Sequence, residues 1–197
     1  MHIAETLIRR KEAWAMFRLF VGIMLPPDVR ASLSRLCCGL AGAKWVDPGS
    51  LHLTVRFIGE VGGGLAEDID AALQQVDAPA FTLMLTGIDC FESGGKAHTL
   101  WTGVGKQPLL SHLRDKVESA LVRAGCEAER RKFKPHVTLA RLRGGESARL
   151  GAFLQQYNHV AVGPFPVDSF TLFRSHLGSE RAHYEALVDY PLEPVPG

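Results

Sequence analysis

A pattern of four residues occurs twice in this chain and constrains its fold more than any other feature. The copies are His52-Leu53-Thr54-Val55 and His136-Val137-Thr138-Leu139, both in the order His, apolar, Thr, apolar. Successive side chains of a β-strand point to opposite faces, so His and Thr would share one face and the apolar residues the other. Two such strands would bury their apolar sides in a core and turn two imidazoles and two hydroxyls into a shared space.

Hydrophobic periodicity predicts strands and helices in alternation along the rest of the chain. Strands are expected at 17–25, 51–58, 81–88, 99–104, 137–142, 166–173 and 184–190, and helices at 28–40, 65–76, 109–124 and 147–157. The order is β-α-β-α-β twice, plus a closing strand. The offsets agree, because 136 − 52 = 84 for the histidines and 165 − 81 = 84 for Phe165 and Phe81. We therefore expect an α+β fold that is bilobal and duplicated, with two antiparallel sheets around a central cleft and helices outside.

Length and charge limit what the chain can be. Its 197 residues suit one bilobal domain, expected over 16–197, and residues 1–15 are set apart as a charged N-terminal extension. The net charge of +1 gives no global reason to expect nucleic acid, so a polyanion would need a local basic patch. No apolar run reaches 18 residues, so no membrane span is expected. The four cysteines form no C-x-x-C pair and are expected to be reduced, which fits the cytoplasm.

The paired motifs carry groups suited to proton transfer at phosphorus. Histidine titrates near neutrality, so one imidazole can remove a proton from an attacking oxygen while the other protonates the leaving oxygen. The hydroxyls of Thr54 and Thr138 can donate hydrogen bonds to non-bridging phosphoryl oxygens. One His-x-Thr strand alone is usually a structural pair, and it is the second copy on a matching element that points to catalysis.

Metal and nucleotide-cofactor sites are less well supported by the sequence. Zinc normally takes three or four protein ligands, and neither motif brings another His, Cys or carboxylate at ligand spacing. The triplet Gly62-Gly63-Gly64 reads as a loop and not as a dinucleotide fingerprint. We therefore expect no metal and no cofactor.

Several cations lie near the motifs. Arg56 has the same strand parity as His52 and is expected to face the cleft, whereas Arg141 has the opposite parity to His136 and would reach it only if the strand twists or ends there. A solvated face is the simpler interpretation for Arg130 and Arg131. Most phenylalanines, Phe57 among them, are expected in the core, although one aromatic at the rim could stack on a base.

The chain resembles the 2H phosphoesterases, and within them the RNA 2′,3′-cyclic phosphodiesterases, historically called 2′-5′ RNA ligases. The resemblance spans about residues 16 to 193. It rests on 18–22, 45–46, 52–59 and 133–141, and on a C-terminal Phe170-x-Leu172-x-x-Ser175 followed by Tyr184.

The resemblance implies a bilobal fold and metal-independent hydrolysis of terminal RNA 2′,3′-cyclic phosphates to 2′-phosphates. By the same resemblance His136 is the general base on water and His52 the general acid, although the near-symmetry of the site leaves these two roles exchangeable. Thr54 and Thr138 would hold the phosphoryl oxygens, with Arg141 and Arg56 adding positive charge. The expected partners are RNA with a cyclic phosphate end or small cyclic nucleotides, bound by a monomer in the cytoplasm.

Two alternatives use the same fold. A 2′-5′ RNA ligase would run the reaction in reverse at the same residues, and a non-catalytic RNA-binding module would keep the fold without turnover. If the protein binds RNA but shows no turnover, and binding survives when both histidines are replaced, the binding module is favoured.

Overall fold

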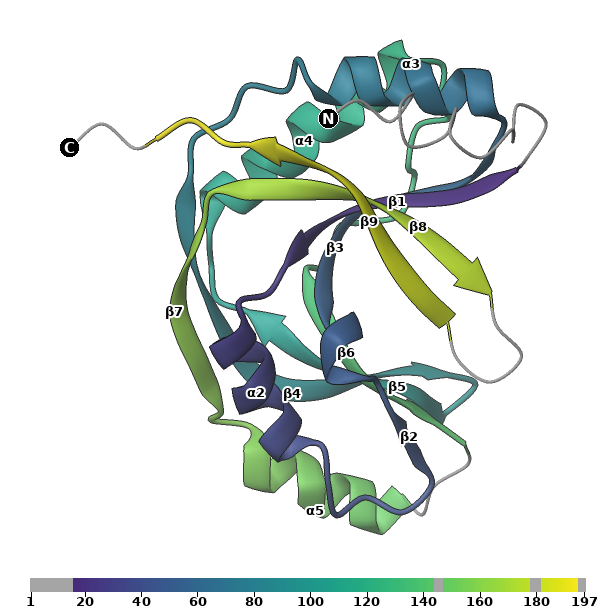
Figure 1. Cartoon of the computed structure of the whole chain (residues 1–197). Helices are drawn as coiled ribbons and strands as arrows, with labels where there is room; N and C mark the ends of the chain where they lie inside the picture. The colour runs from purple at the N-terminus through teal and green to yellow at the C-terminus, as the bar shows by residue number, and fades with distance from the viewer. Residues whose placement is uncertain (1–15, 144–146, 178–181, 195–197) are drawn as a thin grey trace.

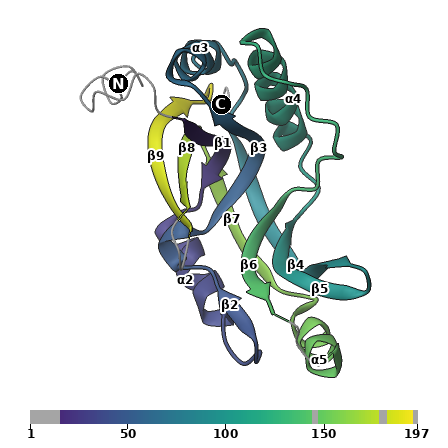
Figure 2. The same cartoon turned by 90° about the vertical axis from the view of Figure 1, so that its right-hand side faces the viewer.

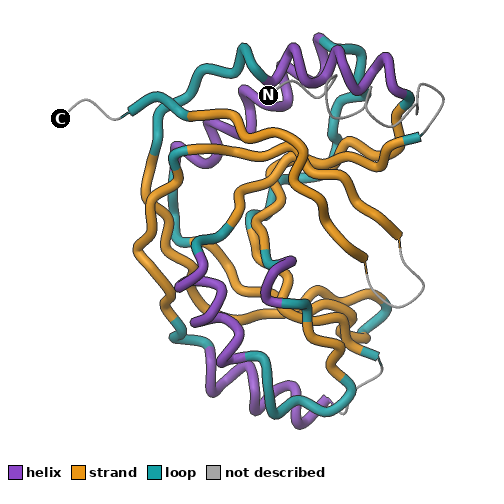
Figure 3. The backbone as a smooth tube through the Cα atoms, in the orientation of Figure 1, coloured by secondary structure: helices purple, strands orange, loops and turns teal. Residues whose placement is uncertain are grey.

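The computed structural model describes residues 16–143, 147–177 and 182–194. The expected N-terminal extension, residues 1–15, lies outside the described residues. Figure 1 shows a strongly curled β-sheet with helices at its upper and lower ends. Figure 3 shows the same division, with the strands in the middle of the molecule and the helices at its periphery. The α+β class predicted from the sequence is confirmed.

Nine strands make up this sheet within the described residues. They are β1 (Phe17–Met24), β2 (Ala43–Trp45), β3 (His52–Val61), β4 (Phe81–Ser93), β5 (Lys96–Val104), β6 (His136–Leu142), β7 (Ala161–Val167), β8 (Ser169–Leu177) and β9 (Ala182–Pro191). The sheet order is β7-β4-β5-β6-β3-β1-β8-β9, with β2 paired to β6, and all strand pairs are antiparallel.

The strands belong to one continuous sheet, so the expected pair of separate sheets is wrong as stated. The two motif strands β3 and β6 are direct neighbours at the centre of the order, with Leu53 opposite Val137. This contact joins a half made of β3, β1, β8 and β9 to a half made of β7, β4, β5, β6 and β2. The sequence could not show it, because the pairing connects strands that are 84 residues apart, from 53 to 137.

Four α-helices and one 3₁₀ turn lie between the described strands. They are α2 (Pro27–Leu36), η1 (Pro48–Ser50), α3 (Gly63–Leu73), α4 (Pro108–Arg123) and α5 (Ser147–Tyr157). Proline stands at the first position of α2 and α4, where its missing N–H costs no hydrogen bond. The side chain of Gln107 accepts a hydrogen bond from the amide of Leu109 at 3.1 Å and so caps α4.

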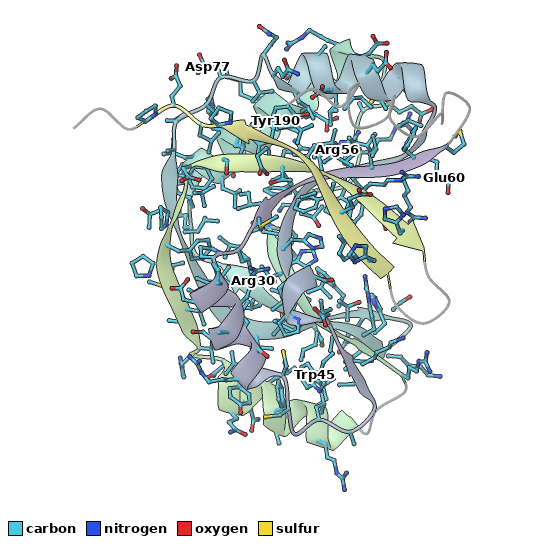
Figure 4. All side chains as sticks on the ribbon, in the orientation of Figure 1. Arg30, Trp45, Arg56, Glu60, Asp77 and Tyr190 are labelled. Carbon is cyan, nitrogen blue, oxygen red and sulfur yellow. The ribbon has the colours of Figure 1, made fainter. Side chains whose placement is uncertain are left out.

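The helices cover the apolar side of the sheet. Leu113, Val117 and Leu121 of α4 are fully buried, at helical spacing, together with Ile69 and Leu73 of α3. At the same end of the molecule the hydroxyl of Tyr190 on β9 donates a 2.6 Å hydrogen bond to the buried carboxylate of Asp70 on α3, in the upper part of Figure 4. One core therefore runs under the whole sheet and fixes the backbone of β3 and β6.

Most predicted elements exist, with shifted ends. The strand expected at 166–173 is divided into β7 and β8 around Asp168, and β2 had no separate prediction. All four cysteines are free thiols. No described helix is long and apolar enough to cross a membrane.

Candidate active site

The register between β3 and β6 brings the two motifs together. Leu53 and Val137 face each other and are both fully buried in the core. If this antiparallel register is continued by one residue on each side, His52 lies opposite Thr138 and Thr54 lies opposite His136. The four half-buried polar side chains share the other face of the two strands, which we call the histidine face. The predicted association of the motifs is thus present, with each histidine opposite the other motif's threonine.

Both imidazoles are oriented by the same kind of hydrogen bond. Nδ1 of His52 lies 2.7 Å from the carbonyl oxygen of Ser50, and Nδ1 of His136 lies 2.7 Å from that of Lys134. A carbonyl only accepts, so each Nδ1 carries the proton and donates it. In the neutral ring Nε2 is then the unprotonated nitrogen, and it is the atom available for proton transfer in both histidines.

Aromatic rings enclose His52. Its imidazole centroid lies 4.8 Å from the ring of Phe20 and 5.8 Å from that of Phe173, and Tyr184 meets it edge-on at 4.8 Å. These three residues come from β1, β8 and β9. Phe20 and Tyr184 belong to the stretches that carry the family resemblance, but sequence reasoning placed none of the three at the site. Their approach to His52 depends on pairing between distant strands.

A second aromatic group surrounds His136. Phe91 of β4 meets its imidazole edge-on with centroids 4.9 Å apart, and Trp101 of β5 does so at 5.9 Å. The ammonium of Lys134 lies over both rings, 4.3 Å from the centroid of Trp101 and 5.0 Å from that of Phe91. These are cation–π distances, so the rings hold a positive charge beside His136.

Burial lowers the pKa of both histidines, because it disfavours the charged imidazolium. For His52 the hydrogen bond to Ser50 opposes this effect, and the charge of His136 adds to it. For His136 the hydrogen bond to Lys134 opposes it, while the positive charges of Lys134 and Arg141 lower the pKa further. The charge of His136 thus acts on His52, which places the two imidazoles near each other.

The threonine hydroxyls lie beside the imidazoles on the histidine face. Within the described part of the chain, neither Thr54 nor Thr138 has a hydrogen bond from its hydroxyl. Thr138 is paired with Trp101 on β5, and Thr54 with Gly22 on β1. Two half-buried hydroxyls are therefore available to donate to an anion placed between the histidines.

A β-bulge in each motif strand decides where the arginines point. In β3, Val21 pairs with Arg56 and Gly22 with Thr54, so Val55 is the extra residue. In β6, Leu100 pairs with Ala140 and Trp101 with Thr138, so Leu139 is the extra residue. An extra residue reverses the alternation of faces beyond it. The parity assigned from the sequence therefore holds for the motifs and fails immediately after them.

Arg141 lies on the histidine side as a result of this reversal. Its guanidinium donates a 2.6 Å hydrogen bond to the hydroxyl of Thr99, and its charge lowers the pKa of His136. The opposite parity expected for Arg141 therefore does not keep it away from the site.

Arg56 is not brought to the histidines, contrary to the expectation from its parity. Its guanidinium pairs with Glu118 of α4 at 2.5 Å and donates to the carbonyls of Glu127 and Phe57. The side chain is 7% exposed and lies in the upper part of the molecule in Figure 4. Arg56 thus links β3 to α4 and the following loop.

Phe57 takes the position on the histidine side that Arg56 was expected to occupy. It was expected in the core, yet it is 48% exposed, and its ring packs against Phe20 at 5.6 Å. Because Phe20 contacts His52, Phe57 is an aromatic at the rim of the site. Among the described residues, no group of three or more His, Cys, Asp or Glu side chains has an arrangement that could hold a metal ion.

Comparison with known families and relatives agrees with the motifs. The sequence profile of the 2′-5′ RNA ligase superfamily matches residues 24–179. An RNA 2′,3′-cyclic phosphodiesterase of Aeropyrum pernix is 34% identical over 148 residues, which cover 74% of this chain and 84% of the relative. One from Archaeoglobus fulgidus is 27% identical over 173 residues, covering 86% and 97%.

Solved structures resemble the fold over nearly its whole length. The crystal structure of Escherichia coli LigT complexed with 3′-AMP has a TM-score of 0.74 and 26% identity, and the match covers 90% of this chain and 99% of that one. The crystal structure of TT0787 of Thermus thermophilus has a TM-score of 0.75 and 26% identity, covering 90% and 98%.

Proposed function

The chain belongs to the 2′-5′ RNA ligase superfamily, and we propose that it is an RNA 2′,3′-cyclic 3′-phosphodiesterase. It hydrolyses the cyclic phosphate at an RNA end and leaves a 2′-phosphate. The observation that carries this proposal is the symmetric pair of imidazoles, each with Nδ1 bound to the carbonyl two residues before it. The relatives that match most of this chain are RNA 2′,3′-cyclic phosphodiesterases, and their names supply the proposed substrate class.

The proposed reaction requires two proton transfers, one from the attacking water and one to the leaving 3′ oxygen. Nε2 of His136 accepts a proton from water as the water oxygen forms a bond to phosphorus. The bond between phosphorus and the 3′ oxygen breaks, and Nε2 of His52 gives that oxygen its proton. The 2′ ester is retained, and the histidine pair ends with its single proton on the other ring. General acid and base transfers of this kind typically contribute about 10²–10⁴-fold each.

The charges near the site favour this assignment of roles. Lys134 and Arg141 place positive charge beside His136 and lower its pKa, which keeps it neutral and able to accept a proton. His52 has the other imidazole as its charged neighbour, so protonation of His52 is favoured when His136 is neutral. Burial lowers the pKa of both rings, and we assign the proton that the pair shares at the start of the reaction to His52, as the family resemblance implies.

The remaining residues stabilise charge on the phosphoryl group. The hydroxyls of Thr54 and Thr138 donate to the two non-bridging oxygens, one from each motif strand. Arg141 adds a positive charge from the same side. The scheme uses no metal ion, because the two imidazoles perform both proton transfers.

We also propose that the two halves of the sheet are duplicates. The pair Leu53 and Val137 joins positions 84 apart, and so does the pair Thr82 and Pro166 between β4 and β7. The carbonyls of Ser50 and Lys134 that orient the histidines obey the same offset, 134 − 50 = 84. These coincidences support a pseudo-twofold axis between the motifs, which would make the site the meeting point of two equivalent lobes.

The proposed activity is tested with a short RNA that ends in a 2′,3′-cyclic phosphate, incubated with the wild-type protein and EDTA. The expected product is the same RNA with a 2′-phosphate, distinguished from the 3′-phosphate by its mobility and by its behaviour toward phosphatases of known specificity. A 3′-phosphate product, or activity that disappears with EDTA and returns with a divalent ion, would contradict the mechanism. The addition of RNA with a free 5′-hydroxyl tests ligation in the same assay, and a joined product would favour the ligase role.

A further inference from the structure

A cavity of about 670 Å³ lies along the part of β3 that follows the first motif and takes no part in the proposed chemistry. It is lined by the end of β3 from Arg56 to Val61, by Arg18 of β1 and by Leu65 of α3. The segment after α4 contributes residues 125–129 and Arg131. Figure 2 shows this segment leading down beside β3 into β6. Its volume falls within the range of roughly 300–1,000 Å³ typical of ligand sites.

The cavity is connected to the site by a row of aromatic rings. Phe57 forms part of its lining, and its ring centroid lies 5.6 Å from that of Phe20. The ring centroid of Phe20 lies in turn 4.8 Å from that of His52. A strand bound with its terminal phosphate at the histidines would therefore reach Phe57 with the bases that precede the end.

Phe57 has the features of a stacking platform. It is 48% exposed, and among the described residues it is the one aromatic side chain in the group of exposed large hydrophobic residues. The bulge at Val55 turns Phe57 outward and leaves the neighbouring Arg56 buried. Nucleic-acid bases stack on exposed aromatic rings with little dependence on sequence.

Positive charge runs from the cavity wall to the catalytic strand. Arg130, Arg131, Lys132 and Lys134 are all exposed and occupy four of the five positions between 130 and 134, directly before β6. We call this stretch the basic segment. Arg131 is paired with Glu129 at 2.7 Å, but within the described part of the chain neither Arg130 nor Lys132 is paired with a carboxylate.

Acidic residues also line the cavity, so its charge alone does not select an anion. Glu129 is neutralised by Arg131, whose hydrogen bonds hold the pKa of that carboxyl at about 2, whereas Glu60 and Glu127 are exposed. A bound strand would therefore place its bases over Phe57 and its phosphates along the basic segment. The chain's net charge of +1 gives no global attraction for a polyanion, and this local concentration of cations supplies one.

We propose that the cavity and the basic segment form a binding site for single-stranded RNA on the 5′ side of the cyclic phosphate. This inference rests on the proposed function and adds to it a preference for oligonucleotides over mononucleotides. Phe57 stacks on a base, and Arg130 and Lys132 contact the phosphates that precede the end.

The test compares two substrates with the same reactive end, a nucleoside 2′,3′-cyclic monophosphate and a single-stranded hexamer. The quantity compared is the ratio of kcat/KM on the hexamer to kcat/KM on the mononucleotide. Loss of one stacking contact corresponds to about a tenfold fall in this ratio for Phe57→Ala. The double variant Arg130→Gln/Lys132→Gln should lower the ratio as well and should weaken its dependence on salt, because fewer counterions are released.

Matched controls use exposed residues elsewhere. Val122→Ala changes an exposed apolar residue of α4, and Lys106→Gln/Lys116→Gln removes two exposed cations outside the basic segment. The ratio should stay within about twofold of wild type in both controls. A wild-type ratio near one, or a ratio that Phe57→Ala and the double variant leave unchanged, would overturn the proposal.

Direct binding separates this inference from the proposed function. The fluorescence anisotropy of a labelled hexamer that ends in a 2′-phosphate reports binding without turnover. If neither substrate is hydrolysed, the proposed function fails, and the same variants still decide the binding site. Weaker binding in Phe57→Ala and Arg130→Gln/Lys132→Gln than in the controls supports the site, and equal binding in all proteins refutes it.

Discussion

At the scale of single residues, the site depends on which atom of each histidine is free. The carbonyls of Ser50 and Lys134 hold Nδ1 of His52 and His136, so both rings present Nε2. The protein thereby fixes the tautomer before any substrate arrives, and a proton transfer needs no ring rotation. The two rings differ in their surroundings, because the ammonium of Lys134 lies over the aromatic rings that contact His136.

The first prediction concerns Lys134. Its positive charge disfavours the imidazolium form of His136, so Lys134→Met should raise the pKa of His136 toward its ordinary value. A higher pH is then needed to deprotonate the base, and the acidic limb of the kcat/KM profile should move to higher pH. The measurement is a pH–rate profile with a mononucleotide cyclic phosphate as substrate.

The neighbouring lysine supplies the control for this profile. Lys132 is exposed, and no aromatic ring among the described residues holds its ammonium. Lys132→Met should therefore leave the limb in place. A shift to lower pH in Lys134→Met, or equal shifts in both variants, would show that Lys134 does not act on His136.

The second prediction concerns the threonines. Thr138→Val keeps the shape of the side chain and removes the hydroxyl that we propose donates to the phosphoryl group. A hydrogen bond to a charged group is worth about 1.5–3 kcal/mol, so kcat/KM should fall roughly 10- to 100-fold. Thr54→Val should have a similar effect, because Thr54 holds the corresponding position in the first motif. Wild-type kcat/KM in both variants would exclude the hydroxyls from the reaction.

A threonine on the next strand provides a matched comparison. Thr102 pairs with Val137, is fully buried, and its hydroxyl has no hydrogen-bond partner among the described residues. An unpaired buried hydroxyl destabilises the fold, so Thr102→Val should leave activity unchanged and raise the free energy of unfolding by roughly 1 kcal/mol. Thermal unfolding measures this change, and a loss of stability would mean that the hydroxyl has a partner in solution.

At the scale of secondary-structure elements, the bulges explain both what the sequence predicts and what it does not. Alternation of faces correctly groups His52 with Thr54 and His136 with Thr138, because the His-x-Thr part of each motif lies before the bulge. The same rule wrongly turns Arg56 toward the histidines, because the extra residue Val55 comes between them. A bulge depends on pairing with a neighbouring strand, so one strand's sequence does not contain it.

The third prediction follows from the position of Arg56. Its pair with Glu118 is largely buried, with exposures of 7% and 15%. Arg56→Met leaves the Glu118 carboxylate without its cation, and breaking such a pair costs roughly 3–5 kcal/mol. Urea unfolding should show this loss of stability.

Arg141 allows the structural and catalytic roles to be separated. Arg141→Met should change the free energy of unfolding little, because the residue is exposed, and should lower kcat/KM because its charge lies near His136. If Arg56→Met proved as stable as wild type but lost activity, the result would support the role predicted from the sequence, in which Arg56 adds positive charge in the cleft.

At the scale of the whole molecule, the sequence predicts the class of the fold and the equivalence of the motifs. Most helices and strands follow from periodicity, and the offset of 84 between His52 and His136 reappears in the strand pairing. The continuous sheet and the aromatic rings around each histidine were not predicted. They depend on which of several strands lie side by side, and this is decided by the burial of a common core. The monomeric state and the cytoplasmic location remain predictions.

The central claim is that His52 and His136 act together on one phosphorus atom. The most direct test measures kcat for an RNA with a 2′,3′-cyclic phosphate end in wild type, His52→Ala, His136→Ala and the double variant, with EDTA present. Each single variant should lose at least about 10²-fold, and the double variant should lose little more, because residues that act as a unit are not additive. Wild-type turnover in either single variant would contradict the claim.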